Sequence, residues 1–181
     1  ITSLPDQDWL FHSTPSESAY GIVLAKSAYD QGYRKLSILY AEPSQSLSDI
    51  FQENFENWGG EIVAAIPHSV EVATSYQNEL EQAAQGGAEA LVTLSYAEHV
   101  GVYVGEAVMG GFFTEFLGMA SIQSQDFIEQ EILKGATISE GCATTPSFVP
   151  TRFLDKFNES YEAEYGEASP QLQSGNVYDS V

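Results

Sequence analysis

Short apolar runs alternate with longer amphipathic stretches along this chain. Runs of the kind that form buried strands occupy residues 36–41, 61–66, 90–94, 115–119 and 136–145. Apolar residues recur at helical spacing over 15–31, 47–58, 75–85, 100–108, 124–131 and 153–165. Buried strands that alternate with helices are typical of a parallel sheet covered on both faces. The pattern therefore predicts an α/β fold, with a three-layer α/β/α arrangement and a mainly parallel sheet.

Capping and turn residues set the expected limits of these elements. Thr14, Pro15 and Glu17 suit the cap and the first turn of the first helix. Glycines follow most of the helical stretches, and Pro67 is expected to close the second strand. The inner face of the first helix is expected to hold Tyr20, Val23, Leu24 and Ala28.

The length and composition indicate a folded chain of one domain, or at most two small ones. The chain has 181 residues, of which 43% are apolar, so it can bury a core. Residues 167–176 are rich in Ser, Gln, Pro and Gly and are interpreted as a connection that leaves the folded unit. Both ends break off abruptly, and no signal-peptide pattern stands at Ile1, so we expect a piece of something longer.

The charge balance is strongly acidic. There are 26 acidic and 6 basic residues, a formal net charge of −20, and no Lys or Arg lies between Leu36 and Leu133. Nucleic-acid binding needs cations that replace counterions along the phosphates, so a nucleic-acid partner is not expected. Binding to an anionic membrane surface is not expected on the same ground, and no apolar run is long enough for membrane insertion. The acidity itself is interpreted as favouring solubility or as an adaptation to a salty habitat.

The residue types that usually carry catalysis form no recognisable pattern. His12, His68 and His99 lack metal-ligand spacing, and each is interpreted as a surface or packing residue. The single cysteine, Cys142, lies in a predicted strand and is interpreted as a buried structural thiol. Phosphate-binding loops and nucleophile elbows are missing from the sequence. We therefore expect no metal, no cofactor and no enzymatic activity.

Polar residues gather where the predicted strands end. In open parallel sheets, ligands bind outside the carboxyl ends of the strands. Here those ends are Glu42–Ser46, Ser95–Ala97, Ala120–Ser121 and Thr144–Pro146, which are rich in hydroxyl groups. They contain no obvious general base, so they indicate a binding surface and not a catalytic one.

Seven segments stand in a recognisable order: 10–16, 32–40, 58–63, 95–98, 116–128, 140–146 and 177–181. In that order they resemble the periplasmic solute-binding proteins of branched-chain amino acid ABC transporters, which have the type I periplasmic-binding-protein fold. The resemblance covers nearly the whole chain and implies the second lobe of a two-lobed protein. It assigns residues 1–14 to the crossover from a missing first lobe, 15–166 to lobe two, and 167–181 to a truncated crossover back.

The resemblance also implies a function. The family closes two lobes around a small ligand by a hinge motion and presents it to a membrane permease. It is periplasmic or otherwise extracytoplasmic, and it is not enzymatic. Two other interpretations stay open: a ligand-sensing domain of a receptor or regulator, and, less favoured, a small flavodoxin-like α/β enzyme. The missing phosphate loop, acidic triad and nucleophile weigh against the enzyme.

The resemblance implies a role in ligand binding for individual residues of this chain. Tyr96 matches a tyrosine that lines the family's cleft, and Ser95 precedes it. Gln45 and Ser46 stand where the family often has an aromatic residue that packs on the ligand, so this wall is polar here.

The ligand class is inferred from one departure from the family pattern. Ala120 falls where amino-acid binders place an acidic residue against the ligand's α-ammonium group, and Ser121 beside it brings no charge. A buried ammonium without a partner would be costly. We therefore expect Ala120 and Ser121 to contact a ligand without a free α-amino group, such as an organic acid, an aromatic acid or an amide.

Overall fold

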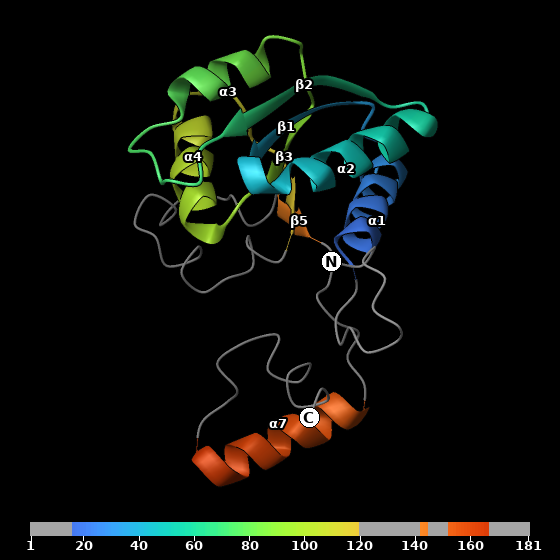
Figure 1. Ribbon diagram of the computed structural model, residues 1–181, viewed down its shortest axis with the longest axis vertical. Coiled ribbons are helices and arrows are strands. Elements are labelled where there is room, and N and C mark those ends of the chain that lie inside the picture. The colour runs from blue at the N-terminus through green and yellow to red at the C-terminus, as the bar shows by residue number, and fades with distance from the viewer. Residues whose placement is uncertain (1–15, 120–141, 145–151, 167–181) are drawn as a thin grey trace, which may run out of the picture. The chain divides into compact units, whose positions relative to one another are not determined.

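The computed structural model describes residues 16–119, 142–144 and 152–166 (Figure 1). The chain divides into two compact units, one of residues 17–145 and one of residues 1–16 with 146–181. The second unit contains the described helix α7 (Arg152–Tyr165). The first contains, in chain order, α1 (Glu17–Asp30), β1 (Lys35–Ala41), the 3-10 turn η1 (Glu42–Ser44), α2 (Gln45–Asn57), β2 (Glu61–His68), α3 (Gln77–Ala84), β3 (Ala90–Leu94), α4 (Ala97–Met109), β4 (Phe116–Gly118) and β5 (Cys142–Thr144).

The described strands form one sheet in the order β2-β1-β3-β4-β5, and every pair is parallel. The chain passes from β1 to β2 on one side and then returns to place β3 on the other side of β1. The point at which the strand order reverses therefore lies between β1 and β3. The predicted α/β class and parallel sheet are confirmed.

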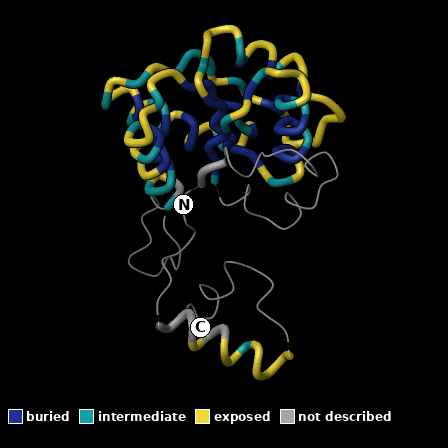
Figure 2. Tube along the Cα trace, turned by 180° about the vertical axis from the view of Figure 1, so that it is seen from behind, coloured by how far each residue is buried: buried dark blue, intermediate teal, exposed yellow. Residues whose placement is uncertain are grey.

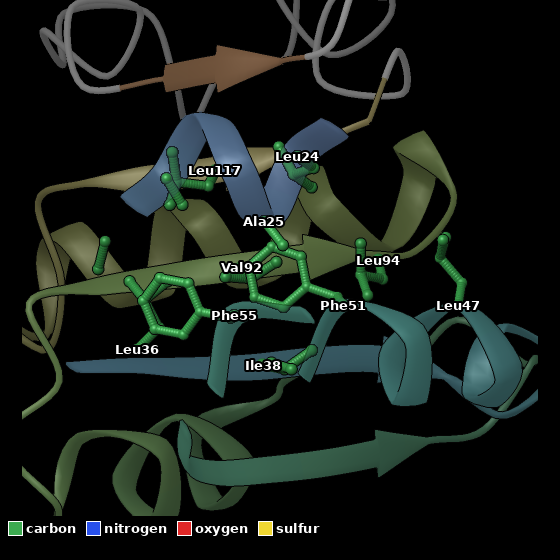
Figure 3. Packing of buried hydrophobic residues seen from close by; sticks show 12 residues of the cluster. Leu24, Ala25, Leu36, Ile38, Leu47, Phe51, Phe55, Val92, Leu94 and Leu117 are labelled. Carbon is green, nitrogen blue, oxygen red and sulfur yellow. The ribbon is translucent and has the colours of Figure 1, made fainter. Parts of the chain in front are cut away.

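Helices cover both faces of the sheet. Successive strand residues point to opposite faces, so the apolar strands contribute buried residues to both helical layers. Helices α1 and α2 pack over one face, where Phe51 and Phe55 of α2 stack with ring centroids 5.8 Å apart (Figure 3). Helices α3 and α4 pack over the other face. Ile38 of β1 points to the first face and Leu39 to the second. The buried part of the chain consequently lies along the sheet, between the two helical layers (Figure 2).

Two details of the predicted elements are wrong. Val23 is 52% exposed, because α1 turns Ala25 toward the core in its place; Leu24 and Ala28 of the predicted inner face are buried as expected. Pro67 does not end β2 but lies inside it, one residue before the last. Strand β2 is at the edge of the described sheet and pairs only with β1, so a residue without an N–H group is tolerated there.

The other limits agree with the sequence to within a few residues. The helix expected at 75–85 begins at Gln77, and Tyr76 stands at its N-cap position as a buried residue. The predicted helix at 124–131 and the first part of the strand at 136–145 lie outside the described residues. The domain limits expected after residues 14 and 166 stay predictions, and α7 belongs to a different compact unit from the strands.

Candidate functional site

The carboxyl ends of three neighbouring strands meet at one edge of the sheet, which we call the carboxyl edge. Ala41 at the end of β1 pairs with His68 at the end of β2, and Tyr40 pairs with Leu94 at the end of β3. The segments that follow these strands are therefore neighbours. The reversal of strand order between β1 and β3 is where open α/β sheets bind ligands. Residues 42–46 and 95–97 follow the two strands that flank this point.

The structure places four of the predicted site residues at the carboxyl edge. Gln45 and Ser46 begin α2 and are exposed. Tyr96 is the N-cap residue of α4 and is 50% exposed, so its ring and its phenol are available to a ligand. Ser95 differs from these three, because it is only 8% exposed. Ala120 and Ser121 lie outside the described residues, and their assignment stays a prediction.

The buried Ser95 is hydrogen-bonded to a histidine. Its Oγ lies 2.7 Å from Nε2 of His68, and Nδ1 of His68 lies 2.8 Å from the carbonyl oxygen of Ser69. A carbonyl oxygen only accepts, so we assign the proton of the neutral ring to Nδ1. Nε2 is then an acceptor, and the Ser95 hydroxyl donates to it.

A second histidine and two tyrosines lie behind this pair. The Tyr76 hydroxyl lies 2.7 Å from Nδ1 of His99, and the backbone N–H of Ala73 donates to the Tyr76 oxygen over 3.1 Å. The rings of His68 and His99 lie 4.7 Å apart between centroids. We call this group the histidine–tyrosine cluster, and its members are His68, Tyr76, Ser95, His99 and Tyr103.

Two buried atoms of the cluster lack a hydrogen-bond partner among the described residues. They are Nε2 of His99 and the hydroxyl oxygen of Tyr103. The hydroxyls of Ser95 and Thr93 lie near the Tyr103 oxygen, but neither meets it with the geometry of a hydrogen bond. Thr93 instead donates to the carbonyl oxygen of Leu117 over 3.2 Å.

Burial disfavours the charged form of His68. It lowers the pKa of His68, and the neighbouring His99 acts in the same direction. The hydrogen bond to the Ser69 carbonyl and the carboxylates of Glu79 and Glu42 raise that pKa, but they do not outweigh burial. Burial also raises the pKa values of Tyr76 and Tyr103. His68 is therefore neutral near pH 7.

A serine hydroxyl on a histidine nitrogen is also the arrangement of a nucleophile and its base. Here Ser95 is 8% and His68 is 5% exposed, so neither is open to a substrate. Nδ1 of His68 is held by a backbone carbonyl and not by a carboxylate. The arrangement favours a structural role for the pair.

Each histidine was expected to be a surface or packing residue, and His68 and His99 are of the packing kind, since both are buried. Their hydrogen bonds were not expected, because no sequence spacing relates residue 68 to residues 95 and 99. The only sequence signal is the position of His68 shortly after the apolar run at 61–66, with Pro67 between them. His12 lies outside the described residues.

The described cations of the sheet-containing unit lie away from the carboxyl edge. Lys35 begins β1, at the opposite end of the strand, and the guanidinium of Arg34 lies 3.9 Å from the centre of the Tyr29 ring. Lys26 forms an ion pair with Asp30 at the end of α1. Groups of three or more metal-binding side chains do not occur within the described ranges. None of the described helices combines the length and apolar character needed to cross a membrane.

Several solved structures share this fold. A branched-chain amino acid ABC transporter from Rhodospirillum rubrum is 19% identical, with a TM-score of 0.81, over 94% of this chain and 49% of its own. A leucine-binding protein from Thermotoga maritima is 20% identical, with a TM-score of 0.76, over 92% and 48%. An ABC transporter solute-binding protein from R. palustris, in complex with benzoate, is 14% identical, with a TM-score of 0.75, over 94% and 47%.

These likenesses establish the fold, and they agree with the resemblance carried by the seven sequence segments. The chain spans about half the length of each of these proteins. No model of a protein family matches the sequence, and no curated protein matches it either.

Proposed function

We propose that this chain is a lobe of an extracytoplasmic solute-binding protein that serves an ABC transporter. A second lobe would complete the site, and closure of the two lobes on a hinge would enclose a small ligand. A membrane permease would then receive the ligand. The support comes from the fold, which this chain shares with solute-binding proteins of ABC transporters.

The observation that carries the proposal is the position of Tyr96. It stands half exposed at the N-cap of α4, on the carboxyl edge beside the reversal of strand order. A tyrosine ring offers a large apolar face, and its hydroxyl both donates and accepts. Gln45 and Ser46 add exposed amide and hydroxyl groups at the same edge. These groups fit a small polar ligand and supply no acid–base pair for catalysis.

We propose further that the ligand is a carboxylate without an α-ammonium group, and we favour an aromatic acid. Ala120 supplies no charge to an ammonium, as inferred from the resemblance. The described segments of the carboxyl edge carry hydroxyl and amide donors, and α4 begins there with its backbone N–H groups. The benzoate complex of the R. palustris protein shows that this fold accommodates such a ligand.

The test is a thermal-shift screen of the protein with any natural sequence that flanks these residues. Benzoate, 4-hydroxybenzoate, short aliphatic acids, amides and leucine are added singly, since binding to the native state raises Tm by mass action. We expect a clear rise with an aromatic acid and none with leucine. Binding of leucine at micromolar strength or better would keep the transport function and refute the ligand class.

Matched variants locate the site. Tyr96→Ala should abolish most of the Tm rise, whereas Met109→Ala should leave it intact. Met109 is 71% exposed and ends the same helix that Tyr96 begins, so it controls for a change in α4 itself. If no ligand shifts Tm, the sensor and enzyme interpretations gain weight, and the transport proposal fails.

A further inference from the structure

One hydrogen bond joins two strands that are not neighbours in the sheet. His68 ends the edge strand β2, and Ser95 follows β3, while β1 lies between them. The bond of 2.7 Å between Nε2 of His68 and Oγ of Ser95 therefore passes the carboxyl end of β1. Backbone pairing within the sheet does not make this link, so the two side chains alone provide it.

The bond fixes the residue directly before Tyr96. When His68 is neutral and its proton is on Nδ1, its Nε2 accepts the hydrogen bond from the Ser95 hydroxyl and so holds that side chain in one orientation. Tyr96 follows at once as the N-cap of α4, and its carbonyl accepts from the backbone N–H groups of His99 and Val100. The turn formed by Ser95 and Tyr96 is thus held on one side by the first residues of α4 and on the other side by His68.

The surroundings of His68 favour its neutral form. The His99 ring lies 4.7 Å away, and the Tyr76 and Tyr103 rings meet the His68 ring edge-on at 5.2 Å and 6.1 Å. Among the described residues, the charged groups that face the cluster are carboxylates: Glu42 from η1, Glu79 from α3, and Glu98 and Glu106 from α4. They would stabilise a cation, but burial of the ring opposes one more strongly.

We propose that His68 is a positioning residue for ligand binding: its hydrogen bond to Ser95 holds the turn that presents Tyr96, and binding requires the uncharged imidazole. This inference rests on the proposed function, because it deepens the role of Tyr96. The ligand does not touch His68. A ligand-binding affinity that falls in mild acid is the expected consequence, as protonated Nε2 can no longer accept from Ser95.

The first measurement follows binding of benzoate by titration calorimetry between about pH 7.5 and about pH 5, because burial moves the titration of His68 toward the acid end of the histidine range. Benzoate stays ionised throughout. We expect the wild-type Kd to rise toward the acid end. His68→Ala should weaken binding about tenfold at neutral pH, the effect of one lost buried hydrogen bond, and should flatten the pH profile.

Two milder variants keep the test decisive if the alanine variant does not fold. His68→Gln retains both a donor and an acceptor but does not titrate, so it should restore affinity near that of the wild type with a flat pH profile. Ser95→Ala removes the bond from the other side and should flatten the profile in the same way. An identical pH profile in the wild type and in His68→Gln would overturn the proposal.

A measurement without ligand separates this inference from the proposed function. Amide hydrogen exchange at His99 and Val100, whose N–H groups donate to the Tyr96 carbonyl, reports the opening of the turn. His68→Ala should speed this exchange about tenfold relative to the wild type, and Met109→Ala should not change it. Faster exchange without binding of any carboxylate would refute the proposed function but keep the positioning role. Tight benzoate binding with unchanged exchange would overturn the positioning role alone.

Discussion

The two buried tyrosines of the histidine–tyrosine cluster give a sharp test of the hydrogen bonding. Tyr76→Phe removes a hydroxyl that meets Nδ1 of His99 at 2.7 Å and accepts from the Ala73 N–H at 3.1 Å. Tyr103→Phe removes a hydroxyl that has no partner among the described residues. Both tyrosines are buried, and the same single oxygen atom is deleted in each variant. The difference in stability therefore isolates the hydrogen bonds.

The expected magnitudes follow from what each deletion leaves behind. Without the Tyr76 hydroxyl, Nδ1 of His99 is stranded in the interior, and each buried polar group left unpaired costs about 1–3 kcal/mol. His99 Nε2 already lacks a partner within the described ranges, so neither ring nitrogen would then have one there. Deletion of the Tyr103 hydroxyl leaves nothing unpaired and relieves a desolvation cost, so its effect should be between zero and a gain of about 1 kcal/mol.

The assay is thermal unfolding of both variants beside the wild type. A change of 1 kcal/mol moves Tm by roughly 2–4 °C in a chain of this size. Tyr76→Phe should lower Tm by about 4–8 °C for a loss of about 2 kcal/mol, and Tyr103→Phe should leave it unchanged or raise it slightly. Equal losses in the two variants would show that the Tyr103 hydroxyl is also bonded, and the reasoning would fail.

Three further outcomes are expected from unfolding experiments. Phe51→Ala should cost about 3–5 kcal/mol, because the ring is fully buried, whereas Val23→Ala on the exposed face of α1 should be close to neutral in urea titrations. Gly60→Ala should cost about 1–3 kcal/mol by calorimetry, since its Cβ would lie 2.2 Å from the Phe55 ring; a neutral result would contradict this packing. Glu89 accepts two backbone N–H groups at the start of β1, at 2.6 Å and 3.0 Å, and these bonds lower its pKa. Its contribution is present above its unfolded pKa of 4.5 and is lost as pH falls through the lower folded value, so Glu89→Gln should flatten the acid limb of stability against pH.

The fold could be predicted from the sequence because the signals for it are local. The run at 90–94 is apolar throughout, and all five residues of β3 are buried. Helix α2 was expected from Leu47, Phe51 and Phe55 at helical spacing, and all three are buried against the sheet. Such periodicities depend only on the geometry of a helix or strand, so they can be recognised in the sequence alone.

The exceptions arise where a tertiary neighbour decides. Val23 has the right residue type for a core position, but the side of α1 that packs is set by α2, where a Cβ on Gly21 would lie 3.0 Å from Ile50. Pro67 is a strong breaker by itself, yet its strand lies at the sheet edge and tolerates it. Neither outcome follows from local sequence.

The sequence by itself determined the α/β class, the order of the elements and the strand ends at which a ligand is expected. Only the tertiary structure decided which of those ends are neighbours, and it brought His68, Tyr76 and His99 together with Ser95 in one buried cluster. The physical reason is that helical and strand periodicity is local. The cluster instead joins residues 27 and 23 positions apart, and strand order alone makes them meet.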